Sequence, residues 1–159
     1  MKRILFVCVE NSNRSQMAEA FARIHGAGKV EAHSSGSRPS GRVNPKAIEA
    51  MRELGYDLTA HSSKGLESFN GTKVDVAITM GCGDTCPIFP GKRYEDWALD
   101  DPAGLDVASV RPIRDAIKRR VEDLLADMGV DVRKRFVYCD SHCTEEVFSI
   151  IESTILKAK

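Results

Sequence analysis

Hydrophobic positions along the chain follow two patterns. Short unbroken runs of branched residues, such as ILFV at 4–7, are typical of buried strands, whereas apolar residues that recur every three or four positions, as in SQMAEAFARIH, are typical of amphipathic helices. We therefore predict strands at residues 2–7, 30–34, 74–80 and 93–99. The predicted helices cover residues 15–25, 45–54 and 112–128.

This alternation of strands and helices predicts an α/β fold. Strand–helix–strand units build parallel sheets that are covered on both faces, so we expect three layers around a central, mainly parallel four-stranded sheet flanked by helices. Gly129 is a helix stop, and a second apolar repeat, EEVFSIIESTIL, follows it. We therefore divide the chain into a domain at residues 1–128 and a C-terminal helical extension of unknown role at 129–159.

Length and charge narrow the classes of function. The 159 residues suffice for one domain with a hydrophobic core. The 23 basic and 23 acidic side chains give a net charge of zero, which provides no electrostatic reason to bind nucleic acid or an anionic membrane. No apolar run is long enough to span a bilayer, and the apolar start is too short for a secretory leader. A cytoplasmic location is expected by default.

The loop after the first predicted strand carries the first chemical signal. In FVCVENSNRS, Cys8 ends the strand, Arg14 follows after five residues, and Ser15 begins the helix. Backbone N–H groups in such a loop can turn inward around an anion, and the N-terminus of the following helix adds unpaired donors. The amides in a position to do so belong to Val9, Glu10, Asn11, Ser12, Asn13 and Arg14.

These residues suit one reaction. A helix N-terminus and an adjacent cation favour the thiolate form of a cysteine, and the guanidinium of Arg14 matches two oxygens of a tetrahedral oxyanion. A lone cysteine at the end of a core strand is more often a small buried hydrophobe. The complete set of strand, Cys8, Arg14, Ser15 and helix outweighs that alternative. We predict that Cys8 attacks the central atom of a bound phosphate-like oxyanion.

A candidate general acid lies in LDDPAG, residues 99–104. Pro102 restricts the residue before it, so Asp101 is held in a stiff, extended turn. Alone, an Asp-Pro pair is most often an ordinary turn. Together with a nucleophilic loop, a fixed carboxyl can protonate the oxygen that leaves. We predict this role for Asp101 and rank Asp100 second.

The other cysteines leave three alternatives. Cys82 and Cys86 lie in the glycine- and proline-rich stretch TMGCGDTCPIFPGK, and Cys139 and Cys143 lie in CDSHC. Five cysteines without a secretory leader argue against a disulfide framework. The loop pair could be inert thiols, part of a zinc site completed from CDSHC, or a disulfide relay to Cys8. We favour the relay, because the loop pair is not spaced as CxxC and its loop composition argues against buried thiols. Cys139 and Cys143 receive no catalytic role.

Together these motifs resemble the low-molecular-weight protein tyrosine phosphatase superfamily and, within it, the arsenate reductases. The similarity covers about residues 2–128 and is carried by CVENSNRSQMAEAF, VNPKAIEAM, MGCGDTCP and YEDWALDDPAG. A phosphatase of this superfamily usually has tyrosines after the Asp-Pro pair, whereas Ala103 and Gly104 follow here. The resemblance implies an oxidoreductase that reduces arsenate to arsenite, as in arsenical resistance.

The resemblance also implies a role for each residue of the loop. Cys8 attacks arsenate, while Arg14 and the loop amides hold its oxygens. Ser15 supports the thiolate, and Asp101 protonates the departing hydroxide. Phosphate is a near isostere of arsenate, so it is expected to bind at the same place.

In the thioredoxin-linked branch of these relatives, a loop cysteine opens the adduct and a second one resolves the disulfide. The matching residues are Cys82 and Cys86, although their spacing is shorter than in those relatives. No bound cofactor is implied. The implied partner is an external reductant, either thioredoxin or mycothiol or glutathione with glutaredoxin, and we favour thioredoxin.

Some of these relatives bind potassium beside the loop. Their ligands match Asn11, Glu19 and Ser34, but the remaining acidic ligand falls at Lys64. An ammonium group can stand where the ion would be. We therefore predict no metal and no potassium requirement.

Two other functions stay open. A hydrolase of phosphotyrosine or another phosphomonoester would turn over without a reductant and would tolerate loss of both loop thiols. A metal-binding regulator would hold stoichiometric zinc through Cys82, Cys86, Cys139 and Cys143, but it leaves the Cys8 loop unexplained.

Overall fold

A parallel sheet of four strands forms the centre of the protein. The computed structural model describes residues 1–69, 72–81 and 91–130. The strands stand in the order β2-β1-β3-β4, and every neighbouring pair is parallel. They are β1 (Lys2–Cys8), β2 (Val30–Gly36), β3 (Val74–Thr79) and β4 (Gly91–Asp96). The predicted four-stranded parallel sheet is confirmed.

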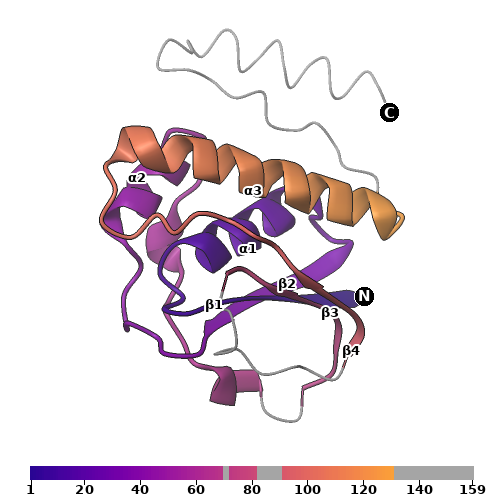
Figure 1. Cartoon of the computed structure of the whole chain (residues 1–159). Coiled ribbons are helices and arrows are strands. Elements are labelled where there is room, and N and C mark those ends of the chain that lie inside the picture. Colours follow the sequence, from indigo (N-terminus) through magenta and orange to yellow (C-terminus); the bar gives the residue numbers. More distant parts are fainter. Residues whose placement is uncertain (70–71, 82–90, 131–159) are drawn as a thin grey trace, which may run out of the picture.

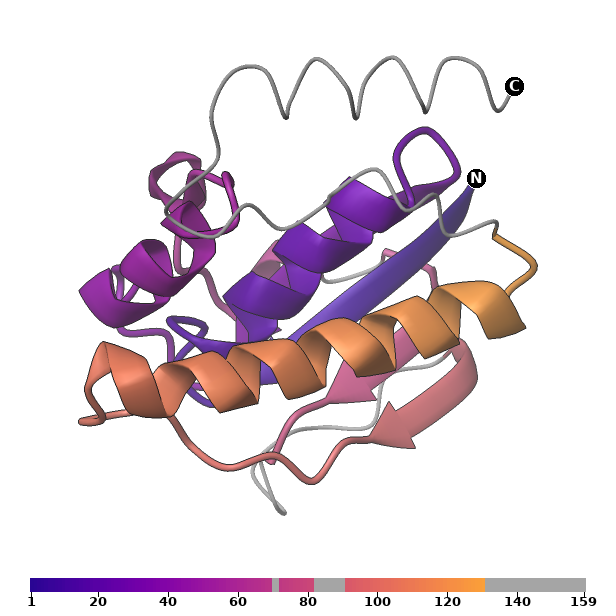
Figure 2. The ribbon, with the colours of Figure 1, turned by 90° about the horizontal axis from the view of Figure 1, so that it is seen from above.

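Helices cover one face of this sheet (Figure 1). They are α1 (Arg14–His25), α2 (Pro45–Arg52) and α3 (Val107–Asp127). Seen from above, α1 and α3 lie side by side across the sheet (Figure 2). A short 3-10 helix, η2 (Leu66–Phe69), packs on the opposite face, and a second one, η1 (Leu58–Ala60), follows α2. The predicted three-layer α/β fold is confirmed, with η2 as the described cover of the second face.

The central strand β1 is buried on both faces. Ile4 and Phe6 belong to the main core under the helices, whereas Leu5 and Val7 belong to a smaller cluster that includes Phe69. All four of these side chains are fully buried. Successive side chains of a strand point to opposite faces, so an unbroken apolar run is the sequence signature of a central parallel strand.

The start predicted for the third helix, Pro112, was wrong. α3 begins five residues earlier at Val107, because Asp106 caps it: its Oδ1 accepts the N–H of Ser109 (2.9 Å). Pro112 lies inside the helix and only lacks the N–H that would donate to the carbonyl of Ala108. A proline near a helix start therefore did not mark the first residue here.

The strand predicted at 93–99 was placed too late, since β4 covers Gly91–Asp96. The N–H of Trp97 still donates to the carbonyl of Thr79 (2.8 Å). The carbonyl of Leu99 instead accepts a hydrogen bond from Arg14 (3.4 Å). Residues after Trp97 leave the sheet because they turn toward the loop that follows β1. The other boundaries differ from prediction by one or two residues.

The C-terminal extension predicted at 129–159 lies outside the described residues except for its first two. Gly129 follows α3 with φ 77°, a left-handed conformation that suits glycine after a helix. Val130 packs against the main core. The division of the chain at residue 128 stays a prediction. In the described part of the chain, no helix combines the length and the hydropathy needed to cross a membrane.

Candidate active site

Cys8 lies at the carboxyl end of the central strand, where parallel α/β sheets bind their ligands. It is the last residue of β1, and α1 begins at Arg14, so the connecting loop is short. Both side chains are buried: Cys8 is 3% and Arg14 6% exposed. The strand and the helix therefore bring the predicted nucleophile and the predicted cation to opposite ends of one small loop.

Two hydrogen bonds converge on the sulfur of Cys8. The backbone N–H of Asn11 donates to Sγ (3.2 Å), and the hydroxyl of Ser15 lies 2.9 Å away. Asn11 has φ 50°, and it is the one non-glycine residue with positive φ in the described part of the chain. This left-handed conformation, uncommon outside glycine, is what aims its N–H at the sulfur.

The direction of the hydrogen bond between Asn11 and Ser15 follows from one unambiguous donor. The backbone N–H of Lys64 donates to Asn11 Oδ1 (2.9 Å), so the other end of that amide is the NH2 group. This NH2 donates to Ser15 Oγ (2.8 Å). Ser15 Oγ can accept that bond and still donate its own hydrogen to Cys8 Sγ when the sulfur is a thiolate. A thiolate at Cys8 would then accept from both Asn11 N–H and Ser15, and such charge-assisted bonds stabilise it.

The carbonyl groups of the loop point outward, to residues 37–44. Backbone N–H groups of that segment donate to four of them, at 2.8–3.2 Å: Ser37 to Cys8 O, Arg38 to Val9 O, Ser40 to Glu10 O and Asn44 to Ser12 O. In a trans peptide the C=O and the next N–H point in opposite directions. The N–H groups turned to the inner side of the loop therefore belong to Val9, Glu10, Asn11 and Asn13. Such a concave row of donors suits an oxyanion.

Arg14 connects this loop to two distant segments. Its Nη1 donates to the carbonyl of Leu99 (3.4 Å), and its Nη2 lies 3.8 Å from Asp101 Oδ1. Gly81 lies directly beside the same guanidinium, since a Cβ atom at this position would be 2.5 Å from Nη1. Gly81 also has φ 76°, so glycine is required by both space and backbone conformation.

The predicted general acid is far more open to solvent than the loop. The side chain of Asp101 is 64% exposed, and its Oδ1 accepts the N–H of Ala103 (3.0 Å). Asp100 is exposed as well. Of these two carboxylates, the structure describes an ion pair with Arg14 for Asp101. The fold thus brings Asp101 and Cys8 to the same edge of the sheet through Arg14.

A buried carboxylate, Glu19, lies behind the loop. His61 Nδ1 lies 2.6 Å from its Oε2, Arg23 lies 3.6 Å and Lys64 3.9 Å from its Oε1. Burial alone would raise the pKa of Glu19. The hydrogen bond from His61 and the nearby positive charges outweigh burial and lower the pKa, so Glu19 is a carboxylate at neutral pH.

The ammonium group of Lys64 lies beside Glu19 and Ser34, two of the residues that the resemblance in sequence relates to a potassium site. Its Nζ donates to Ser34 Oγ (3.4 Å) and to the carbonyl of Ser62 (3.2 Å), and it faces Glu19. Burial lowers the pKa of Lys64, and Glu19 acts in the opposite sense. The contacts are those expected of an ammonium in place of the ion, and the lack of a potassium requirement stays a prediction.

Two residues behind the loop were missed in the sequence. Gln16 is fully buried, and its Nε2 donates to both oxygens of Asn11 (3.0 Å each). Its Oε1 accepts from His61 Nδ1 (3.0 Å), and His61 Nε2 bonds to Tyr56 OH (2.7 Å). The available signal for Gln16 was its position directly after the Cys8–Ser15 loop. His61 carried no such signal, because Glu19 and Gln16, which it contacts, lie on α1, far away in the chain.

The cysteines of the predicted relay, Cys82 and Cys86, lie outside the described residues, as do Cys139 and Cys143. The relay and zinc alternatives therefore stay predictions. Within residues 1–69, 72–81 and 91–130, no group of three or more His, Cys, Asp or Glu side chains could hold a metal.

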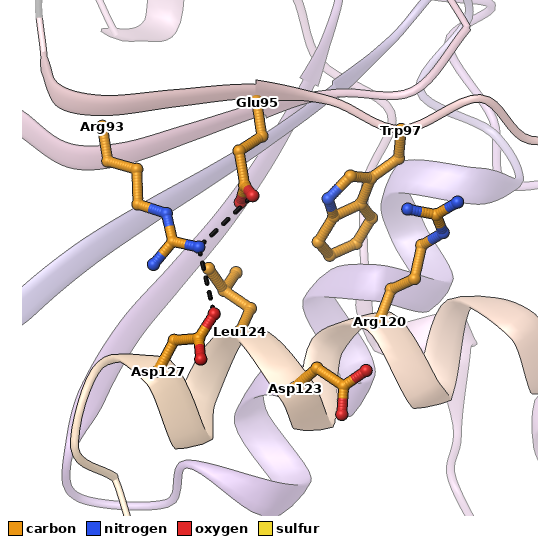
Figure 3. A pocket seen from close by; sticks show the side chains of 7 residues that line it. All are labelled: Arg93, Glu95, Trp97, Arg120, Asp123, Leu124 and Asp127. Carbon is orange, nitrogen blue, oxygen red and sulfur yellow. Dashed lines mark hydrogen bonds and ion pairs between the residues drawn. The ribbon is translucent and has the colours of Figure 1, made fainter.

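An open groove lies between β4 and α3, apart from this site (Figure 3). In it Arg93 bonds to Glu95 (3.2 Å) and Asp127 (3.3 Å), and Arg120 stacks over Trp97. Its lining consists of Arg93, Glu95, Trp97, Arg120, Asp123, Leu124 and Asp127. None of these belongs to the Cys8 loop or to the Asp101 turn, so the groove is not part of the candidate active site.

A strand that ends on a buried cysteine, a loop of inward amides and a buried arginine define a phosphatase-like oxyanion site. The sequence pattern of the low molecular weight phosphotyrosine protein phosphatase family matches residues 3–134, and the chain belongs to this family. Several members of the family to which the chain is similar are named arsenate reductases.

A glutaredoxin arsenate reductase of Synechocystis sp. is 44% identical over 132 residues, which are 81% of this chain and 100% of that protein. The structure of an arsenate reductase in the phosphate binding state is 42% identical with a TM-score of 0.73, and the match covers 80% of this chain and 98% of that one. A thioredoxin-dependent arsenate reductase of Corynebacterium glutamicum is 33% identical with a TM-score of 0.68, over 81% of this chain and 62% of that one.

Proposed function

We propose that the protein reduces arsenate to arsenite with Cys8 as the nucleophile. The observation that carries this proposal is the sulfur of Cys8, which accepts a hydrogen bond from Asn11 N–H (3.2 Å) and lies 2.9 Å from the hydroxyl of Ser15, inside a loop of inward amides. The names of the similar proteins support arsenate as the oxyanion.

The first step forms a bond between sulfur and arsenic. The Cys8 thiolate attacks As(V), while the loop amides and Arg14 hold the arsenate oxygens. One arsenate oxygen leaves as hydroxide, and Asp101 supplies the proton that converts it to water. The 3.8 Å distance from Asp101 Oδ1 to Arg14 Nη2 supports this role, because it places the carboxyl group beside the group that binds the oxyanion.

The second step transfers two electrons to arsenic. A thiolate of Cys82 attacks Cys8 Sγ, a disulfide forms, and the sulfur–arsenic bond breaks with its electron pair on arsenic, which leaves as As(III). Cys86 then attacks Cys82 and frees the Cys8 thiolate. Support for Cys82 comes from its place in the chain directly after Gly81, which lies against Arg14.

An external reductant then restores the Cys82 and Cys86 thiols. The more similar relative is named for glutaredoxin and the less similar one for thioredoxin. The thioredoxin preference drawn from the sequence therefore has no stronger support than glutaredoxin. We propose that thioredoxin or glutaredoxin reduces a Cys82–Cys86 disulfide by dithiol–disulfide exchange.

A single-turnover experiment tests the proposal. Fully reduced protein is mixed with arsenate without added reductant, arsenite is quantified, and the disulfides are mapped by mass spectrometry. One equivalent of arsenite with a Cys82–Cys86 disulfide is the expected result. Arsenite that appears only after mycothiol or glutathione is added would overturn the internal relay. Phosphatase turnover without any arsenite would overturn the reductase function.

A further inference from the structure

One peptide group of the Cys8 loop forms hydrogen bonds through both its N–H and its carbonyl. One of the donors to the carbonyl, Ser63, lies far along the chain. The peptide joins Glu10 to Asn11. Its N–H end donates to Cys8 Sγ (3.2 Å). Its carbonyl end accepts two hydrogen bonds, one from the N–H of Ser40 (3.0 Å) and one from the hydroxyl of Ser63 (2.9 Å). A carbonyl oxygen has two lone pairs, so both are used.

The hydroxyl of Ser63 is itself oriented. The backbone N–H of Gly41 donates to Ser63 Oγ (3.2 Å), which leaves the hydroxyl hydrogen for the carbonyl of Glu10. Gly41 has φ 84°, a conformation open to glycine. Two successive hydrogen bonds thus connect the N–H of Gly41, the hydroxyl of Ser63 and the carbonyl of Glu10, and each has one possible direction.

The arrangement matters because Asn11 is in an uncommon conformation. A positive φ is less favourable for a non-glycine residue, although less so for asparagine than for most, and the conformation persists where its surroundings hold it. Rotation of the Glu10–Asn11 peptide would relieve that cost, and it would also turn the N–H of Asn11 away from the sulfur. The two donors on the carbonyl of Glu10 oppose this rotation.

We propose that Ser63 is a positioning residue for the nucleophile. By holding the carbonyl of Glu10 outward, its hydroxyl keeps the N–H of Asn11 aimed at Cys8 Sγ and stabilises the thiolate that attacks. As a statement about turnover, this inference rests on the proposed function of Cys8. As a statement about the reactivity of the sulfur, it stands independently, because any electrophile reports on the thiolate.

The test uses the full chain and an isosteric pair of variants. Ser63→Val has nearly the shape of Ser63→Thr but no hydroxyl, and Ser63→Ala adds a smaller substitution. Ser68→Ala is the matched control, since Ser68 is exposed on η2 and has no role in the site. Two quantities are measured at pH 7: the alkylation rate of Cys8 by iodoacetamide, followed on its own peptide by mass spectrometry, and single-turnover arsenite release.

Loss of the hydroxyl is expected to slow alkylation of Cys8 about threefold to tenfold, because the hydrogen bond from Asn11 N–H to the charged sulfur would be loosened but not removed. The rate of arsenite release at saturating arsenate should fall by a similar factor, with a smaller change in the arsenate concentration at half-maximal rate. Ser63→Thr should retain most of both rates, and Ser68→Ala should match the unaltered protein.

Equal alkylation rates in Ser63→Val and Ser63→Thr would overturn the proposal, even if both variants melt at lower temperature, since Ser63 would then only join two loops. If Ser63→Ala does not fold, the Val and Thr pair decides. Slower alkylation in Ser63→Val together with no arsenite from any variant would support the positioning role and overturn the proposed reductase function.

Discussion

The two regions that supply the chemistry, the Cys8–Ser15 loop and the Leu99–Gly104 turn, are built in opposite ways. The loop is buried, and the sulfur of Cys8 accepts a hydrogen bond from the N–H of Asn11 and lies beside the hydroxyl of Ser15. The turn is open: Asp101 is 64% exposed, and one ion pair at 3.8 Å ties it to Arg14.

This difference matches what each group must do. A nucleophile and an oxyanion are stabilised by donors that are already in position, because reorganisation during the reaction would cost free energy. A general acid only has to reach one oxygen within hydrogen-bond distance, and it must exchange its proton with water between turnovers. A buried loop serves the first task, and an exposed carboxyl serves the second.

The largest effect is expected from Cys8→Ser. A serine hydroxyl is not ionised at neutral pH, so arsenite release should fall by at least about 10³-fold. The measurement is single-turnover arsenite release. Phosphate should still raise the melting temperature of the variant, because the amides and Arg14 remain. Release above about one tenth of the original rate would show that another thiol attacks.

Asp101→Asn should rank second. An amide cannot supply the proton, so the rate at saturating arsenate is expected to fall about 10²-fold, with a smaller change in the half-saturating arsenate concentration. The same measurements on Asp100→Asn sharpen the assignment. A larger loss in Asp100→Asn than in Asp101→Asn would move the acid to the neighbouring position.

Gly81→Ala should have a smaller effect, about tenfold on the rate at limiting arsenate, because its methyl group would displace the guanidinium of Arg14. The matched control is Gly28→Ala. Gly28 has φ 74°, and nothing lies within 4 Å of a Cβ placed there. Equal losses in the two variants would mean that backbone strain, and not the position of Arg14, explains the effect.

Glu19→Gln tests the support behind the loop through stability. The folded pKa of Glu19 is lowered, so its contribution is present above the ordinary value of 4.5 and is lost as the pH falls through the folded pKa. The variant should lose about 1–3 kcal/mol of unfolding free energy at pH 7, and its stability should fall less steeply in acid. Urea unfolding from pH 3 to pH 7 measures both. If the variant and the unaltered protein show the same pH dependence of the unfolding free energy, the ionised form of Glu19 does not contribute to stability.

The smallest effect is expected from potassium. Because the ammonium of Lys64 faces Glu19 and Ser34, replacing sodium chloride with potassium chloride should leave the rate of arsenite release unchanged. Lys64→Asp replaces the ammonium by a carboxylate beside Glu19 and Ser34, and in this variant potassium should increase the rate. Stimulation of the unaltered protein by potassium would contradict the prediction.

The sequence by itself determined the parts of the protein that are local. The run ILFV predicted the central strand, the three-to-four-residue repeat after Ser15 predicted α1, and together they located the Cys8 loop. Strand and helix periodicity depend on neighbours in the chain, so a single sequence reveals them. The same reasoning failed at Pro112, where the cap at Asp106 prevailed.

The tertiary structure alone decided how the loop is held. Lys64 fixes the amide of Asn11, Ser63 and Ser40 hold the carbonyl of Glu10, and Gly81 borders the guanidinium of Arg14. These contacts join segments that are far apart in the chain, and hydrogen bonds of this kind leave no periodic trace in the sequence. The residue types of the site were therefore readable from the chain, whereas the directions of its donors were set by the fold.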